Sequence, residues 1–143
     1  MNETQLVVFD IANFTCGIDI KRVKEINRKV EINRVSTAPD YVKGVINLRG
    51  DIVTIIDLHK KLNIIDNTSK ESKRYIIANW EGEPVGIEVD AICDILTVLD
   101  DEISSVPSNL SSKISEFFES VFHKDDKIIG ILDIDALLGI YNE

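Results

Sequence analysis

An internal repeat is the feature that most constrains the fold of this 143-residue chain. At an offset of 69 residues, CGIDIKRVKEI at 16–26 aligns with VGIEVDAICDI at 85–95, so that glycine, apolar and acidic positions coincide. At an offset of 76, DIVTIIDLHKKLNI at 51–64 aligns with KIIGILDIDALLGI at 127–140. Seven additional residues in the second copy explain the change of offset. The chain therefore contains two copies of one unit of about 65 to 70 residues.

Each copy predicts a series of short β-strands. It begins with a β-rich segment, QLVVFDI at 5–11 or RYIIANW at 74–80, which is followed by a polar turn and a second strand. After a proline-containing loop comes a second hairpin, whose last strand ends at Asp57 in one copy and at Asp133 in the other. We expect each of these carboxylates to cap a short helix.

The strand pattern predicts an all-β fold with short helical segments. Five strands per copy, with turn signals at close spacing, are typical of a small closed or nearly closed barrel. We assign residues of about 5–68 to the first barrel and about 72–143 to the second, within one domain spanning 1–143. Gly17 and Gly86 are expected at equivalent places. The residues predicted to face the cores are Ile18, Ile20, Val53, Ile55, Ile87, Val89, Ile129 and Ile131.

The segment SSKISEFFESVFH at 111–123 carries two conflicting signals. Its apolar residues recur at helical spacing. At the offset of 76, however, its second half aligns with the strand predicted around Val45. Because the repeat covers far more of the chain, we give it precedence and expect a helical turn at about 111–116 and a strand at about 118–123.

Charge and hydropathy exclude several classes of function. A net charge of −9 disfavours binding of nucleic acid through its phosphates. Residues 1–65 carry ten cationic and eight acidic side chains, whereas residues 66–143 carry six and 17. This asymmetry could orient the chain between partners, or simply reflect solvated acidic loops. Without a secretory signal or a run of about 18 apolar residues, we expect a cytoplasmic protein with no direct membrane insertion.

No group of residues in the sequence indicates catalysis, a metal site or a cofactor. His59 and His123 have no partners at ligand spacing, and Asp57, near His59, is predicted to start a helix instead. Cys16 and Cys93 lack a CxxC partner and an activating basic residue. Glycine-rich phosphate loops and nucleophile elbows are absent from the sequence. The expectation is a non-enzymatic protein, with an enzyme or a small-ligand barrel as the alternative class.

Turns and strand ends supply the candidate binding residues. Glu25 lies in the basic stretch KRVKEINRK, where it would also discourage unwanted strand pairing. Arg49 interrupts two apolar runs in GVINLRGDIVTIIDL, where Gly50 can take the positive φ that a tight hairpin requires. The aligned residue of the second copy is Asp125, so the fold does not require a cation at this point. We predict that Arg49 is exposed and binds a partner carboxylate.

The segments CGIDIKRVKEI, APDYVKGVINLRGDIVTIIDLHKKL and VGIEVDAICDIL resemble the CheW family of bacterial chemotaxis coupling proteins, from about Gln5 to about Leu138. The resemblance implies two five-stranded barrels of the Src-homology type related by a pseudo-twofold axis, in agreement with the repeat. It also implies a non-enzymatic adaptor that couples the cytoplasmic tips of chemoreceptors (methyl-accepting chemotaxis proteins) to the regulatory domain of the histidine kinase CheA. A CheW-like adaptor of a pilus or other non-flagellar signalling system is the alternative.

The same resemblance implies a set of partner-binding residues and a location. The location is the cytoplasm, in association with membrane-bound receptor arrays, and no cofactor is implied. The residues that match the family's partner-contacting positions are Val23 and Glu25 in KRVKEI, Gly44, Asn47 and Arg49 in KGVINLRG, and Ile95 in CDIL.

Overall fold

The computed structural model describes residues 3–28, 30–64, 73–107, 116–124 and 126–139. Its strands are β1 Glu3–Ile11, β2 Phe14–Asp19, β3 Val23–Asn27, β4 Val42–Leu48, β5 Asp51–Asp57, β6 Arg74–Trp80, β7 Glu83–Val89, β8 Ala91–Leu99, β9 Ile103–Ser104, β10 Phe118–Lys124 and β11 Lys127–Leu132. Its helical segments are the 3-10 turns η1 Ile20–Arg22 and η2 Asp100–Glu102, and the helices α1 Leu58–Lys61 and α3 Ile134–Gly139. None of the described helices is long and apolar enough to cross a membrane.

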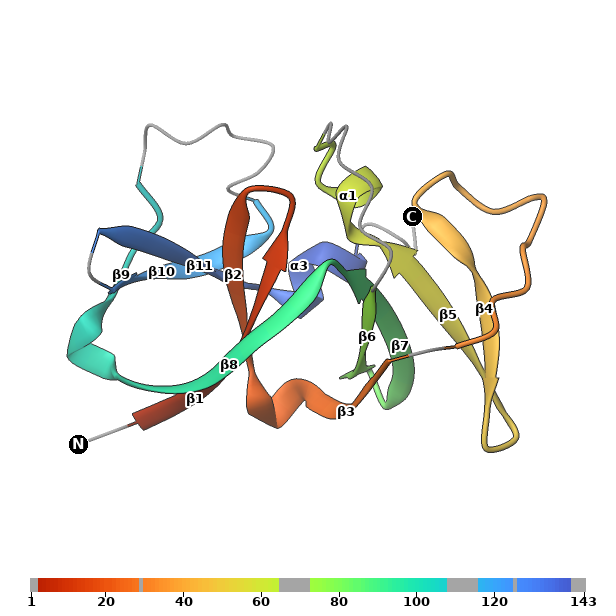
Figure 1. The fold of residues 1–143 in the computed structure, drawn as a ribbon, viewed down its shortest axis with the longest axis horizontal. Coiled ribbons are helices and arrows are strands. Elements are labelled where there is room, and N and C mark those ends of the chain that lie inside the picture. Colours follow the sequence, from red (N-terminus) through yellow and green to blue (C-terminus); the bar gives the residue numbers. More distant parts are fainter. Residues whose placement is uncertain (1–2, 29, 65–72, 108–115, 125, 140–143) are drawn as a thin grey trace.

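The strands form two sheets that lie side by side (Figure 1). One sheet, which we call barrel I, has the order β8-β1-β2-β11-β10-β9. The other, barrel II, has the order β3-β6-β7-β5-β4. Exchanging the strands of the two copies converts β8-β1-β2-β11-β10 into β3-β6-β7-β5-β4. The identical order is the topology expected of two barrels related by a pseudo-twofold axis.

The barrels do not follow the boundary between the two copies. Barrel I combines β1 and β2 of the first copy with β8 to β11 of the second, and barrel II combines β6 and β7 with β3 to β5. The allocation of residues 5–68 to one barrel and 72–143 to the other is therefore wrong. Both copies carry the same pairing pattern, so the first hairpin of each copy fits the strands of either one. Each exchanged hairpin is joined to the strands of the other copy by a parallel pair, β2–β11 in barrel I and β5–β7 in barrel II.

Equivalent residues occupy equivalent places in the two barrels. Gly17 pairs with Val8, and Gly86 pairs with Ile77, which is the same register shifted by 69 residues. The caps correspond in the same way, since Asp57 accepts a hydrogen bond from the amide of Lys60 at 3.3 Å and Asp133 one from Ala136 at 3.1 Å. These findings confirm the repeat and both predicted caps.

Each barrel is closed by the segment that follows the edge strand named first in its strand order, which is β3 in barrel II and β8 in barrel I. After β3 the chain returns to β4, where Asn33 and Val45 exchange two backbone hydrogen bonds of 2.8 Å. After β8 it passes through η2 into β9, where Ser104 pairs with Val121 of β10. Because Val45 and Val121 are equivalent in the repeat, the two barrels close at the same place.

The conflicting segment forms a strand where the structure describes it. Strand β10 spans Phe118–Lys124, which confirms the strand expected at about 118–123. Most of the helical turn expected at about 111–116 lies outside the described residues. The helical spacing of the apolar residues is thus overridden by pairing with β11 and β9.

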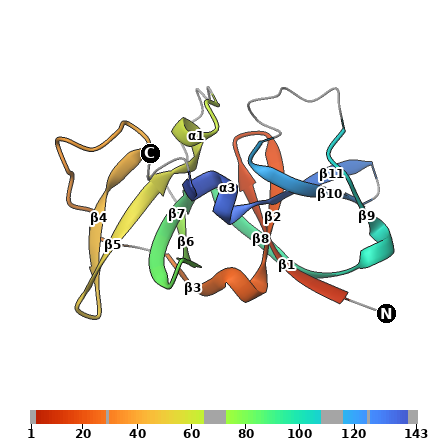
Figure 2. The ribbon, with the colours of Figure 1, turned by 180° about the vertical axis from the view of Figure 1, so that it is seen from behind.

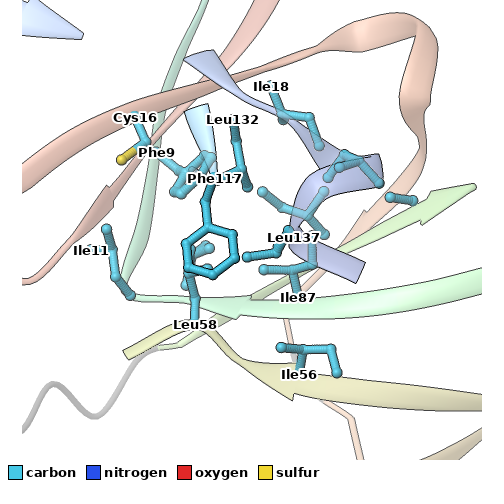
Figure 3. Close-up of a cluster of buried hydrophobic side chains, with 14 of the residues drawn as sticks. Phe9, Ile11, Cys16, Ile18, Ile56, Leu58, Ile87, Phe117, Leu132 and Leu137 are labelled. Atoms are coloured by element: carbon cyan, nitrogen blue, oxygen red, sulfur yellow. The ribbon is translucent and has the colours of Figure 1, made fainter. Parts of the chain in front are cut away.

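Apolar residues fill three cores, one inside each barrel and a central core between them. Both faces of β1 and β6 are buried, which explains why LVVF and YIIA are continuous rather than alternating apolar runs. Figure 3 shows Phe117, Leu137, Leu58 and Ile87 converging in the central core. The central core includes Val7, Phe9, Ile11, Cys16, Ile18, Ile56, Leu58, Ile76, Ile87, Val89, Phe117, Leu132, Ile134, Leu137 and Leu138.

Seven of the eight predicted core residues are buried, and Ile20 is the exception. Strand β2 ends at Asp19, whose carboxylate accepts a hydrogen bond from the amide of Lys21 at 3.0 Å and starts η1. Ile20 therefore lies in a 3-10 turn, half-buried against the central core. The strand predicted to include Ile20 ends one residue earlier, at Asp19, because the Asp19 side chain caps η1 and ends the extended backbone.

Candidate partner-binding surface

The β4–β5 turn presents Arg49 on a rigid two-residue loop. Arg49 and Gly50 have φ angles of 51° and 90°, and positive φ at both central residues defines a type I′ turn. The side chain of Asn47 stabilises the turn by accepting a hydrogen bond from the amide of Gly50 at 3.1 Å. The Arg49 side chain is 71% exposed, as expected, while its contact with a partner remains a prediction.

Arg49 forms an ion pair with Glu25, which joins two of the sequence-predicted site residues. Glu25 lies on β3 and Arg49 follows β4, and these strands stand at opposite ends of the barrel II order. The pair thus spans the line along which barrel II closes. Glu25 is 24% exposed, so the carboxylate is fixed by the barrel while the guanidinium stays open to solvent. Exposed ion pairs contribute only about 0 to 1 kcal/mol to stability.

Two exposed isoleucines accompany these charges, and sequence reasoning did not select them. Ile52 is 67% exposed and pairs directly with Asn47 across the hairpin, so both side chains lie on one face. Ile26 follows Glu25 on β3 and is 37% exposed, with its side chain on the opposite face of the strand. No alternation of polar and apolar residues in IVTII marks Ile52 as exposed, because Ile56, on the same face of β5, is buried. Apolar area beside a fixed charge pair is suited to protein recognition.

Ile95 lies apart from this group, on β8 of barrel I, and is 51% exposed. Its equivalent in the repeat is Ile26 on barrel II, so each barrel exposes the same isoleucine. Ile52 likewise has an exposed equivalent, Ile128, on barrel I. The candidate residues therefore define two related surfaces, one on each barrel, rather than a single patch.

The remaining two candidates have positions that serve the fold. Val23 begins β3 and packs, half-buried, against the central core. Gly44 is buried, and a Cβ placed on it would lie 2.3 Å from the backbone oxygen of Asn33. Both residues thus help to shape the barrel II strands that carry Glu25 and Arg49. Gly44 in particular lets the closing segment approach β4.

A buried carboxylate, Asp90, forms the most extensive polar network in the described residues, and sequence reasoning missed it. The side chain is 1% exposed. It accepts a hydrogen bond from the amide of Ala12 at 2.7 Å, both carboxylate oxygens lie 3.0 Å from Nε2 of His59, and Nζ of Lys73 is at 2.5 Å. These partners come from three separate segments of the chain. No local sequence pattern brings them together.

The surroundings of Asp90 lower its pKa. Burial acts to raise the pKa, but the hydrogen bonds from Lys73, the Ala12 amide and His59 outweigh it and hold the pKa at about 2, against an ordinary value of 3.8. A carboxylate whose pKa falls on folding stabilises the native state above the unfolded pKa. That contribution is lost as the pH falls through the folded pKa.

We therefore expect the stability of the protein to fall between pH 4 and pH 2, with about 2 kcal/mol of the loss due to Asp90. Urea unfolding of the wild type and of Asp90→Asn at pH 5, 4, 3 and 2.5 measures this share. The difference between the two should shrink steadily toward pH 2. A difference that is constant over this range would contradict the assigned pKa.

The described residues offer little for catalysis. Burial raises the pKa of the Cys16 thiol to about 12, and burial together with a hydrogen bond to Asp10 raises that of Cys93 to about 11. Neither thiol is therefore activated as a nucleophile. Among the described residues, no group of three or more His, Cys, Asp or Glu side chains could hold a metal ion. His59 contacts Asp90, while Asp57 caps α1.

Two pseudo-symmetric barrels with exposed apolar and charged surfaces define a tandem-barrel domain. Residues 5–140 match the CheW-like domain family. The chain is 32% identical over 139 residues to the chemotaxis protein CheW of Treponema pallidum, covering 94% of this chain and 82% of that protein. It is 31% identical over 134 residues to CheW of Bacillus subtilis, with coverages of 94% and 86%. The chain belongs to the CheW family of chemotaxis scaffold proteins.

A solved structure shows the same fold. The crystal structure of the scaffolding protein TtCheW from Thermoanaerobacter tengcongensis matches with a TM-score of 0.90 and 30% sequence identity. The match covers 99% of this chain and 97% of that one. The all-β tandem-barrel prediction is thereby confirmed over the length of the domain.

Proposed function

We propose that this protein is a non-enzymatic, cytoplasmic adaptor that couples chemoreceptor tips to the histidine kinase CheA in a signalling array. Membership of the CheW family supports this proposal. The observation that carries it is Arg49, a 71% exposed guanidinium that is fixed on a type I′ turn and braced by Glu25. An arginine on a type I′ turn with an ion pair to Glu25 loses less entropy on binding than one on a flexible loop, and it can hold a partner carboxylate through two hydrogen bonds.

The mechanism is scaffolding, in which the adaptor holds receptor and kinase in a fixed relative geometry. Barrel II offers the Glu25–Arg49 pair with Ile52, and barrel I offers Ile95. Two surfaces on one domain allow two partners to bind at once. A conformational change in the receptor would then alter kinase activity through the adaptor.

Co-precipitation with the regulatory domain of the cognate kinase and with a receptor-tip fragment, singly and together, tests the function. We expect binding to each partner and a ternary complex when both are present. Binding to neither would contradict the proposal. Using kinases from a flagellar and from a pilus-type pathway of the same cell separates the two kinds of adaptor.

Arg49→Ala should weaken binding of at least one partner by about 1 to 3 kcal/mol, the range for losing a charge-assisted hydrogen bond. Stability should change by roughly 0.5 kcal/mol or less, because the side chain is exposed and its ion pair is a surface pair. Titration calorimetry and thermal melts measure the two effects.

Lys60→Ala is the matched control, since it removes an exposed cation from α1, at the opposite end of barrel II (Figure 1). The control should leave binding unchanged. Loss of stability in Arg49→Ala with intact binding per folded molecule would show instead that Arg49 supports the barrel.

A further inference from the structure

The described chain passes between the two barrels at two places only. It leaves barrel I for barrel II through η1, after β2, and returns through Asp90, between β7 and β8. In Figures 1 and 2, η1 lies at the lower edge of the molecule, whereas α1 and the β1–β2 turn lie at the upper edge. Any rotation of one barrel relative to the other must bend the chain at these crossovers.

At the Asp90 crossover, polar contacts reach both barrels; we call them the buried crossover contact. The backbone amide of Asp90 donates to the carbonyl of Asp10, and its carboxylate accepts from the amide of Ala12, both in barrel I. The same carboxylate binds His59 of α1, which follows β5 of barrel II, and Lys73, which precedes β6. One 1% exposed side chain thus binds groups of both barrels at once.

At the η1 crossover, Arg22 makes the corresponding contacts, which we call the exposed crossover contact. Its Nη2 donates to the carbonyl of Asn79 on β6 of barrel II at 3.1 Å. The guanidinium also binds both carboxylate oxygens of Asp135 on α3, which follows β11 of barrel I, at 2.9 and 3.4 Å. Arg22 is 34% exposed and Asp135 is 68% exposed.

The two contacts use equivalent partners, although the crossover residues Asp90 and Arg22 themselves are one position apart in the repeat at the offset of 69. His59 and Asp135 occupy the same place in α1 and α3, at the offset of 76, and each binds the side chain of a crossover residue. The carbonyls of Asp10 and Asn79 are equivalent at the offset of 69, and each accepts from the crossover residue. Different residues therefore make the same kind of contact at both crossovers.

The hydrogen bonds at the two crossovers supply a directional constraint on the angle between the barrels, which apolar burial in the central core does not supply. Burial of apolar surface between the barrels is strong but non-directional, so by itself it does not single out one angle between them. Hydrogen bonds depend steeply on distance and angle. We propose that the buried and exposed crossover contacts set the angle between the barrels. His59, Asp90, Arg22 and Asp135 are thus positioning residues for any partner that contacts both barrels.

Distance measurement on the protein alone tests the proposal. Spin labels are attached at exposed positions, one on each barrel, through Glu83→Cys on β7 and Thr97→Cys on β8, in a Cys93→Ser background. Pulsed electron paramagnetic resonance then gives the distribution of distances between them. The buried contact is weakened by His59→Leu with Lys73→Met, and the exposed contact by Arg22→Met.

The matched control is Lys43→Met. It removes a cation 2.6 Å from Glu88, a carboxylate that is 4% exposed, but both residues lie within barrel II. We expect the control to keep the wild-type distance distribution, and the crossover variants to shift or broaden it. An unchanged distribution in the folded crossover variants would overturn the proposal. If His59→Leu with Lys73→Met does not fold, Arg22→Met decides alone, and an unchanged distribution there overturns it.

A second readout is binding, which rests on the proposed function. A partner that spans both barrels should bind the crossover variants about 5-fold or more weakly, while a partner of one barrel should bind them normally. Absence of binding by the wild type would count against the proposed function and leave the distance result standing. The two failures are therefore distinguishable.

Discussion

Replacing Asp90 with alanine should lower the free energy of unfolding by about 3 to 5 kcal/mol, the range for removing one partner of a buried ion pair. The side chain is 1% exposed and satisfies the Ala12 amide, His59 and Lys73. Alanine would leave a backbone donor and two cationic or polar side chains without their acceptor in a dry environment. Chemical denaturation at neutral pH measures the loss.

Asp101→Ala is the control for Asp90→Ala, because Asp101 is an exposed carboxylate in η2. Its removal should change the unfolding free energy by roughly 0.5 kcal/mol or less. Asp90→Asn retains an acceptor for the Ala12 amide and should cost less than alanine. Equal, small effects of Asp90→Ala and Asp101→Ala would show that the network contributes nothing to stability.

Gly44→Ala should destabilise the protein by about 3 kcal/mol, combining overpacking with strained backbone. A Cβ on Gly44 would lie 2.3 Å from the oxygen and 2.9 Å from the carbonyl carbon of Asn33, and the residue has a φ of +157°. Backbone atoms of the closing segment cannot move aside as a flexible side chain can. Barrel II should therefore close poorly, which urea unfolding would detect as a lower midpoint.

Gly50→Ala separates the two causes. Gly50 has a φ of +90°, but a Cβ there would meet nothing within 4 Å, so only backbone strain of about 1 kcal/mol is expected. If Gly44→Ala cost no more than Gly50→Ala, the close approach of Asn33 would be unimportant. With the expected result, weak partner binding by a Gly44 variant reflects a damaged barrel rather than a lost contact.

The candidate site was predictable where it depends on local backbone. The Leu48–Asp51 hairpin, the glycine at its second position and the exposure of Arg49 all follow from turn chemistry, which acts over four residues. The Glu25–Arg49 pair could not be predicted in this way, because it forms only when β3 and β4 meet at the closure of barrel II. Gly44 was selected as a partner-binding residue, which stays a prediction, whereas its close approach to Asn33 depends on the same closure.

The sequence by itself determined the all-β class, the duplication, the two helix caps and most core positions, because periodicity and capping are local and occur twice in the chain. Only the tertiary structure decided which copy each hairpin joins, since both copies present the same pattern to β1–β2 and to β6–β7. It also decided the Asp90 network, whose partners lie 78, 31 and 17 residues away. Contacts over such separations have no local signature, and they form only once the exchanged barrels have packed together.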